Sequence, residues 1–230
     1  MNPISLYEFG SGEDEVRQIQ APFVDLFRHS APVLDVGCGR GVFLELLAAA
    51  GIEAVGLDHS PESVSICQGK GYTVHCEGAR QYLERNAGWF GGIFCHHVIE
   101  HMGYEEAMAF LGQCHLALRP GGTLLLGTPN PEDIAVISEL FWLDPTHVRP
   151  YPHRLLQSML KASGFKIKFS RQYLGSWRMI GRRNLPMYLF RRMLLGRHYG
   201  KPNTLVLAEK EIQTAEAPTG RSIARADHRS

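Results

Sequence analysis

Short apolar runs alternate with stretches of helical spacing along the first 130 residues. The apolar runs predict strands over residues 32–37, 53–58, 72–76, 91–96 and 122–128. Between them, apolar residues recur every three or four positions and predict helices over residues 42–50, 61–69, 79–86 and 104–118. Phe165–Tyr173 and Asn203–Lys210 alternate apolar and polar residues, as an antiparallel pair of strands does. This order of elements indicates an α/β protein.

Three further segments complete the organisation. Residues 12–29 have helical spacing interrupted at Pro22 and predict an N-terminal helix, which we expect to form a lid over a ligand site. Residues 175–202 form an insertion before the last strand, and residues 211–230 predict a disordered tail because they lack apolar periodicity. With 230 residues, of which 44% are hydrophobic, the chain has enough apolar surface for one domain over residues 1–210.

The first predicted strand leads into a glycine-rich loop. The strand V-L-D-V, residues 33–36, is followed by G-C-G-R-G over residues 37–41. Glycine permits positive φ there and lets a ligand approach the backbone. Asp35 lies inside the strand, where it can orient the loop or bind a ligand ammonium, and Asp58 ends the second strand, where it can accept hydrogen bonds from ribose hydroxyls. Because the dinucleotide fingerprint G-x-G-x-x-G is not matched, a dehydrogenase is disfavoured.

The loop with its in-strand acid resembles the first motif of class I S-adenosylmethionine methyltransferases. G-G-I-F-C-H-H-V-I-E-H over residues 91–101 and L-R-P-G-G-T over residues 118–123 follow in that family's order. The resemblance implies a Rossmann-like seven-stranded sheet, flanked by helices, with the last strand antiparallel, and S-adenosyl-L-methionine as the cofactor. The loop L-D-P-T-H-V-R-P-Y, residues 143–151, further resembles bacterial methyltransferases of polysaccharide and O-antigen clusters. More distantly, Glu100-His101 is shared with ubiquinone-pathway O-methyltransferases.

The resemblance also implies which residues bind the cofactor. Asp35 and the glycine loop would hold the methionine end, Asp58 the ribose, and His59 would border the adenine with Ala79 against its ring. Many relatives carry an acid one residue before that alanine, where this chain has Gly78, so Glu77 or a backbone group would take its role. The full implied set is Arg17, Asp35, Gly37, Cys38, Gly39, Gly41, Asp58, His59, Ala79, His96 and His97.

The acceptor side is predicted to follow the fourth strand and to include the loop at residues 141–151. We predict His147 as general base or phosphate contact and Arg149 as the residue that binds an anion. The alternative is a tight turn in which the histidine and threonine of D-P-T-H satisfy backbone groups. Glu100 and His101 are predicted to orient the acceptor. His97, Glu100 and His101 have a zinc-like spacing, but His97 falls where this fold lines the cofactor, so we expect no metal.

The charges are distributed unevenly along the chain. Residues 1–144 carry 7 Lys/Arg and 19 Asp/Glu, whereas residues 145–208 carry 13 Lys/Arg and no acid. This segment suggests an anionic partner, or else packing against the acidic half. Inside the insertion, Met187, Phe190 and Leu194 share one face of a predicted helix flanked by arginines. Such a helix can lie on an anionic membrane surface, although a core or dimer contact is an alternative.

We therefore predict transfer of a methyl group from S-adenosyl-L-methionine to an oxygen of a small-molecule, glycan or lipid-linked anionic acceptor, in polysaccharide or lipid-linked sugar metabolism. An RNA acceptor is the first alternative, and a non-catalytic S-adenosylmethionine-binding partner subunit is the second. The five scattered cysteines, and the lack of a signal peptide or a long apolar run, predict a cytoplasmic protein, with peripheral contact to the inner membrane face as an option.

Overall fold

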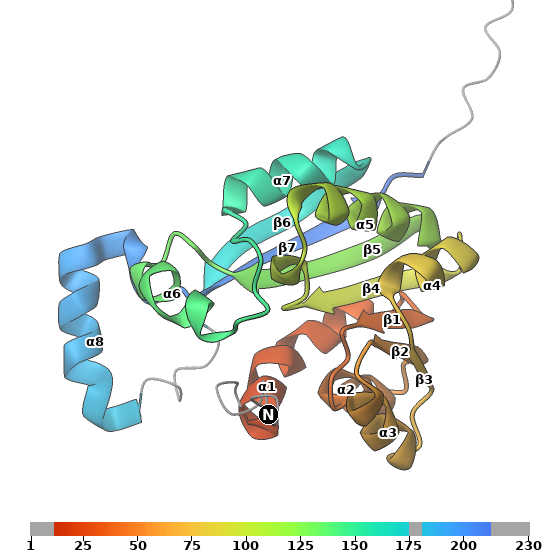
Figure 1. The fold of residues 1–230 in the computed structure, drawn as a ribbon, viewed down its shortest axis with the longest axis horizontal. Coiled ribbons are helices and arrows are strands. Elements are labelled where there is room, and N and C mark those ends of the chain that lie inside the picture. Colours follow the sequence, from red (N-terminus) through yellow and green to blue (C-terminus); the bar gives the residue numbers. More distant parts are fainter. Residues whose placement is uncertain (1–11, 175–180, 213–230) are drawn as a thin grey trace, which may run out of the picture.

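The structure is a computed structural model that describes residues 12–174 and 181–212, except the side chains of residues 181–184. A seven-stranded sheet has the order β3-β2-β1-β4-β5-β7-β6, and β7 runs antiparallel to both of its neighbours (Figure 1). The strands are β1 (Val33–Val36), β2 (Ala54–Asp58), β3 (Val74–Cys76), β4 (Phe90–His96), β5 (Leu118–Pro129), β6 (Phe165–Tyr173) and β7 (Asn203–Lys210). The predicted fold class, with its antiparallel last strand, is confirmed.

Helices cover both faces of this sheet (Figure 1). One core cluster joins the sheet to α4 (Ala79–Arg85), α5 (Tyr104–Ala117) and α7 (His153–Ala162). The opposite cluster joins it to α2 (Val42–Ala49) and to the 3₁₀ helix η2 (Ala21–Phe27). The helix α3 (Pro61–Gly69) packs beside α2 at the β3 edge. All four residues of β1 are buried, because the strand lies at the centre of the sheet between β2 and β4.

The N-terminal helix is shorter than predicted. An α-helix, α1 (Glu13–Gln20), passes into η2 at the point where Pro22 stands. Proline has no N–H and cannot continue the α-helical hydrogen bonds, so the interruption falls where the sequence places it. Phe23, Val24 and Phe27 of η2 are buried in the core, whereas α1 has no buried residue.

Several elements were not among those predicted. These are the short 3₁₀ helices η3 (Ile99–His101), η4 (Leu140–Leu143) and η6 (Gly196–His198), and the helices α6 (Ile134–Ser138) and α7. In α7, Leu156, Met159 and Leu160 form the buried stripe. The insertion contains the helix α8 (Gly181–Leu195), as its apolar spacing predicts. The predicted tail lies outside the described residues from residue 213 onward. No helix in the described part of the chain is long and apolar enough to cross a membrane.

The strand order fixes the position of the site. The chain moves outward from β1 through β2 to β3 and then returns to β4 on the other side of β1. In open α/β sheets, ligands bind beyond the carboxyl ends of strands at such a reversal. The glycine loop follows β1, and residues 96–101 follow β4, so both predicted motifs lie at this place.

Candidate active site

The glycine loop is held by the acid at the end of β2. Gly37, Gly39 and Gly41 all have positive φ, at 72°, 52° and 79°. The Gly39 N–H donates to Asp58 Oδ2 at 2.8 Å, and the Ser60 N–H donates to Asp58 Oδ1 at 2.8 Å. Each carboxylate oxygen can accept a further hydrogen bond. Asp58 can therefore shape the loop and still receive ribose hydroxyls.

Asp35 is a buried carboxyl without a partner on one oxygen. Asp35 is 3% exposed, and its Oδ2 has no hydrogen-bond partner among the described residues. Burial and the neighbouring charge of Asp58 raise the pKa of Asp35 from 3.8 to about 8. A cationic group next to this carboxyl would offset much of the free-energy cost of ionising it in a buried position. The site therefore fits the ammonium of the methionine end of S-adenosylmethionine.

We expect Gly37→Ala to reduce affinity for S-adenosylhomocysteine severely. A Cβ at this position would lie 2.4 Å from Val98 Cγ2, and φ of +72° is unfavourable for residues other than glycine. The loop must shift to relieve this contact. Isothermal titration should show the loss, with Gly51→Ala as the control, because Gly51 also has φ of +72° but an added Cβ there meets no atom within 4 Å. Equal losses in the two variants would mean that backbone strain, and not the contact with Val98, is responsible.

His97 follows β4 in a strained backbone conformation. Its φ of 58° is the only positive value among described residues other than glycine. Its Nδ1 lies 3.1 Å from Glu100 Oε1, and its Nε2 lies 3.1 Å from Asn203 Oδ1. Desolvation lowers the pKa of His97, whose side chain is 41% exposed, but the contacts with Glu100 and Asn203 raise it by more, so the net pKa is raised. Glu100 Oε1 and Asn203 Oδ1 are both acceptors, so both ring nitrogens donate when the ring is protonated.

Glu100 is the buried counterpart of this ring. Its residue is 0% exposed, and its Oε2 accepts a hydrogen bond from Thr128 Oγ1 at 3.0 Å. Burial raises the pKa of Glu100, but the hydrogen bond and charge of His97 lower it by more. Its backbone carbonyl also accepts the N–H groups of Val148 and Arg149, at 2.9 and 3.1 Å. Glu100 therefore connects β4, β5 and the loop at residues 141–151.

His96 lies on the other side of His97. Its Nε2 is 3.1 Å from the Tyr173 hydroxyl, and its ring is stacked on that of Phe94 with 5.8 Å between centroids. Burial and the neighbouring His97 lower its pKa well below the usual value, so the ring is neutral. A Cβ on Gly127 would lie 2.3 Å from His96 Cδ2, so β5 needs glycine opposite this ring.

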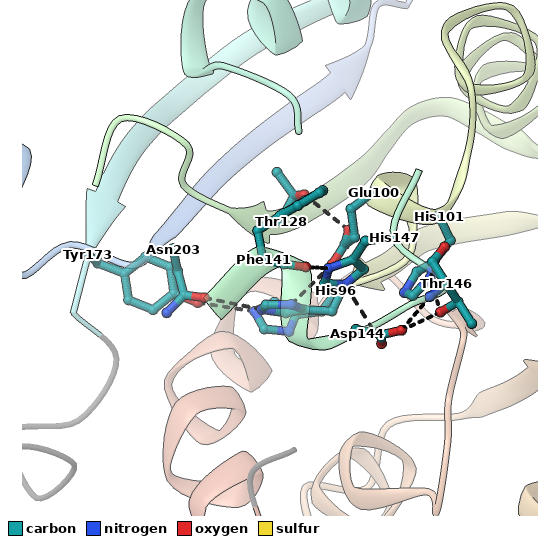
Figure 2. Close-up of polar contacts among 11 residues, drawn as sticks. His96, Glu100, His101, Thr128, Phe141, Asp144, Thr146, His147, Tyr173 and Asn203 are labelled. Carbon is teal, nitrogen blue, oxygen red and sulfur yellow. Dashed lines mark hydrogen bonds and ion pairs between the residues drawn. The ribbon is translucent and has the colours of Figure 1, made fainter. Parts of the chain in front are cut away.

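A hydrogen-bond chain runs from Asp144 through Thr146 to His101 (Figure 2). Thr146 Oγ1 donates to Asp144 Oδ1 at 2.6 Å, and the Thr146 N–H donates to the same oxygen at 2.8 Å. His101 Nδ1 lies 2.9 Å from Thr146 Oγ1 and 3.2 Å from the Thr146 carbonyl oxygen. A carbonyl oxygen only accepts, and the hydroxyl proton already points at the carboxylate, so Nδ1 must donate. The neutral His101 ring therefore carries its lone pair on Nε2.

His147 makes its hydrogen bond to the backbone, unlike His101, which also contacts the Thr146 side chain. His147 Nδ1 donates to the Phe141 carbonyl oxygen at 2.6 Å, its Nε2 lies 3.9 Å from Asp144 Oδ2, and its side chain is 11% exposed. Burial raises the pKa of Asp144, but the hydrogen bonds from Thr146 and the charge of His147 lower it by more. The D-P-T-H segment thus makes the turn contacts that the alternative interpretation of the sequence describes. The His101 and His147 rings nevertheless lie 4.8 Å apart, so both border one site.

Arg149 is stacked between two tyrosine rings. Its guanidinium carbon lies 5.5 Å from the centre of the Tyr104 ring and 5.7 Å from that of Tyr151. Tyr151 is fully buried and donates to the Met102 carbonyl oxygen at 2.9 Å. Such stacking orients a guanidinium and leaves its N–H groups free to bind an anion.

The remaining residues of the implied cofactor set are spread along the edge of the sheet where the parallel strands end. Arg17 of α1 is paired with Glu45 of α2 at 2.8 Å, and this contact raises the pKa of Arg17. His59 is 90% exposed, and Ala79 is half-buried at the start of α4. Glu77, the substitute considered for the acid missing at Gly78, is paired with Arg85 at 2.6 Å. Cys38 is buried in the loop, and burial raises the pKa of its thiol well above the usual range.

One group of side chains near the loop at residues 141–151 has the composition of a metal site. The candidate ligand atoms of Glu100, His101 and His147 lie within 4.8 Å of one another. Each of these side chains, however, already makes the contacts described above: Glu100 with His97 and Thr128, His101 with Thr146, and His147 with Phe141. That the site works without a metal stays a prediction.

Four residues of this network were not singled out from the sequence as site residues. Thr128 near the end of β5 and Asn203 at the start of β7 lie at the same edge of the sheet, because the two strands pair antiparallel. Thr146 contacts His101, and Tyr173 contacts His96. Only Thr146 had a local signal, since an Asp-Pro-Thr sequence favours a turn closed by its own side chains. The others are separated by 28 to 106 residues from their partners, so no local spacing could indicate them.

Comparison with known proteins places this geometry in a sequence family. The model of a family described as a methyltransferase domain matches residues 11–168. The ubiquinone biosynthesis O-methyltransferase of Aromatoleum aromaticum is 30% identical over 104 residues, which cover 43% of this chain and 44% of that protein. The mitochondrial ubiquinone biosynthesis O-methyltransferase of Rattus norvegicus is 32% identical over 114 residues, or 46% of this chain and 32% of that protein. The matches thus span less than half the length of these curated relatives.

Solved structures agree with the fold. The crystal structure of a SAM dependent methyltransferase from Archaeoglobus fulgidus superposes with a TM-score of 0.74 at 26% identity, covering 88% of this chain and 96% of that one. A Burkholderia thailandensis N1-methyltransferase solved with S-adenosylhomocysteine has a TM-score of 0.60 at 17% identity, covering 86% of this chain and 80% of that one, and this likeness supports the fold alone.

Proposed function

Because this chain belongs to the methyltransferase domain family, we propose that it transfers a methyl group from S-adenosyl-L-methionine to an oxygen of an anionic or glycan-type acceptor. The observation that carries the proposal is the pairing of two features at one edge of the sheet. The glycine loop and Asp35 offer a site for a zwitterionic, cationic cofactor. Beyond β4, His101 has its Nε2 lone pair fixed by Thr146 and Asp144. A hydroxyl acceptor needs such a base.

In this proposal each residue has a defined task. Asp35 holds the ammonium of the cofactor, and Asp58 accepts the ribose hydroxyls while it keeps Gly39 in place. The cofactor, when bound, supplies a methyl group already activated on a sulfonium sulfur. His101 Nε2 takes the proton of the acceptor hydroxyl as the new carbon–oxygen bond forms and the carbon–sulfur bond breaks. The positive charge that His101 gains is stabilised by the Asp144 carboxylate through Thr146.

The same geometry gives the neighbouring side chains supporting tasks. The chain Asp144–Thr146–His101 fixes the tautomer of His101, whereas the short contact with Phe141 ties His147 to the loop. We therefore favour His101 over His147 as the base and assign His147 as a contact for a phosphate or carboxylate of the acceptor. Arg149, stacked between Tyr104 and Tyr151, binds the same anion. Glu100 and His97 position the turn that carries His101.

The class of acceptor is supported by sequence similarity. The D-P-T-H-V-R-P-Y loop resembles methyltransferases of polysaccharide clusters, and the curated relatives are named O-methyltransferases of ubiquinone biosynthesis. Both point to oxygen as the atom methylated. The loop also exposes Trp142, Leu143 and Val148, which suits an acceptor with a lipid portion, such as a lipid-linked sugar. An RNA acceptor remains the alternative against which this proposal is tested.

The direct test combines cofactor binding with an acceptor screen. We expect isothermal titration to show one S-adenosylhomocysteine bound per chain at micromolar affinity. Methyl-labelled S-adenosylmethionine should then label lipid-linked or nucleotide-linked sugars, or phenolic lipids, and leave RNA oligonucleotides of mixed sequence unlabelled. Labelling of RNA alone would contradict the acceptor class, and folded protein that binds no S-adenosylhomocysteine would contradict the proposed enzyme.

A further inference from the structure

The helix α8 presents large apolar side chains to solvent. Along Leu185–Leu195 the exposed fractions reach 52% for Phe190, 73% for Met193 and 64% for Leu194. Met187 and Leu189 are also more than half exposed. Contiguous exposed apolar surface of this kind on a folded domain marks an interaction site. In Figure 1, α8 stands away from the sheet and from the helices that cover its faces.

Among the described residues, few side chains of α8 contact the rest of the protein, and those contacts include hydrogen bonds. Tyr188 is buried and donates to the Gly200 carbonyl oxygen at 3.4 Å, and Arg192 donates to the Tyr199 carbonyl oxygen at 2.9 Å. With 3.6 residues per turn, the five apolar residues of α8 that are more than half exposed fall on one continuous arc of about 160° on the other side of the helix, whereas Leu185 and Leu195, at 39% and 37% exposed, lie outside it. That arc consists of Leu189, Met193, Phe190, Leu194 and Met187. The apolar face of α8 is therefore the solvent-facing one.

The charge around this arc is of one sign. Residues 145–208 contain 13 Lys/Arg and no Asp/Glu. Within the described residues, the lysine and arginine ion pairs of this segment reach only Glu209 and Glu211, through Lys168 and Lys166, and none reaches the acidic first half. The segment does pack on the first half through α7, β6 and β7, but the described ion pairs do not show its cations neutralising the acids there. Arg191 and Arg197 flank the arc as exposed cations.

Polar contacts connect the end of α8 to α6, and further exposed apolar side chains follow α6 in the chain. The segment 196–201, which returns from α8, is tied to α6, because His198 Nδ1 lies 3.2 Å from the Glu132 carbonyl oxygen and the Lys201 N–H donates to Asp133 at 2.7 Å. Figure 1 shows α6 between α8 and the sheet. Trp142 and Leu143, directly after α6, are 59% and 42% exposed.

We propose that the apolar arc of α8 docks in the interface of an anionic phospholipid bilayer, with the flanking arginines at the lipid phosphates. A helix at a membrane interface inserts apolar side chains among the lipids and keeps cations at the lipid phosphates, and α8 offers both kinds of side chain without any acid. A second copy of the chain fits less well, because a two-fold contact between α8 helices would bring like charges together. The inference stands on α8 alone and holds whether or not the acceptor is a sugar.

Vesicle flotation of the full chain tests this inference. We expect binding to vesicles of phosphatidylcholine with 30% phosphatidylglycerol, and binding at least about tenfold weaker to phosphatidylcholine alone, since each Lys or Arg near an anionic surface adds to the attraction. The triple variant Phe190→Gln, Met193→Gln and Leu194→Gln should lose binding by about a hundredfold or more. Leu116→Gln, at a residue 62% exposed on α5, is the matched control and should bind normally.

Three results would overturn the inference. These are no flotation of the unaltered chain, equal binding by the triple variant, or a concentration-dependent dimer in sedimentation that the triple variant abolishes. Arg191→Gln should weaken binding only to the anionic vesicles, and equal weakening on both vesicle types would contradict the assigned role of charge. Titration of S-adenosylhomocysteine should be the same for all these variants, which separates this inference from the proposed reaction.

Discussion

Asp35→Asn should weaken binding of S-adenosylhomocysteine by about 100-fold or more while leaving the domain folded. Asp35 is buried, and its unpaired oxygen lies next to the glycine loop. Removing one partner of a buried charged hydrogen bond costs about 2–5 kcal/mol, so we expect affinity to fall about 100-fold or more. The neutral amide carries no desolvation cost for a charge, so the melting temperature of the free protein should stay the same or rise. Unchanged affinity would remove Asp35 from the cofactor site.

The pH dependence of binding provides an independent control for Asp35. The pKa of this carboxyl is raised from 3.8 to about 8, first by burial and then by Asp58. The ammonium of the cofactor binds the ionised form, so affinity should rise up to about tenfold per pH unit toward pH 8 and level off above it. In Asp35→Asn this dependence should vanish. A flat profile in the unaltered protein would contradict the assignment.

The stability of the free protein changes with pH in the opposite direction to the affinity for the cofactor. In the unfolded chain Asp35 ionises near pH 3.8, whereas in the folded protein it keeps its proton up to about pH 8. The folded state therefore binds more protons between these values, and this residue lowers the stability of the free protein as pH rises through the range. Saturating S-adenosylhomocysteine should reverse much of this loss above pH 8, because the ligand binds only the folded protein.

His101→Ala should lower kcat by about 10²- to 10⁴-fold with little change in affinity for S-adenosylhomocysteine. This range is typical of the loss of a positioned general base. The expectation rests on the Nδ1 contacts with Thr146, which leave the Nε2 lone pair free. Single-turnover methyl transfer from labelled cofactor measures kcat without a contribution from product release.

Two further variants distinguish His101 from His147 as the general base. Thr146→Val removes the hydroxyl between His101 and Asp144 and should cost about tenfold in kcat, in keeping with the loss of one hydrogen bond. His147→Ala should raise KM for an anionic acceptor more than it lowers kcat. If His147→Ala instead shows the large kcat loss and His101→Ala does not, the base is His147. Loss of cofactor affinity in both variants would indicate a structural loop.

The cofactor side of the site was largely determined by local sequence. A buried strand, three glycines and a second strand ending in an acid specify a loop whose backbone must adopt positive φ, and the structure shows this at Gly37, Gly39 and Gly41. The interruption at Pro22 is equally local, because it follows from the missing N–H of proline. These features depend on neighbours within a few residues, so a pattern along the chain is enough to find them.

The proposed acceptor side was decided by tertiary structure. His101 meets Thr146 across 45 residues, and His97 meets Asn203 across 106 residues, because β7 pairs with β5 in a register that sets Asn203 opposite Pro129. Which imidazole nitrogen carries a proton follows from such contacts and from nothing in the spacing. For α8, the sequence determined an apolar helical face flanked by arginines. Only the packing of Tyr188 on Gly200 decided that this face points to solvent.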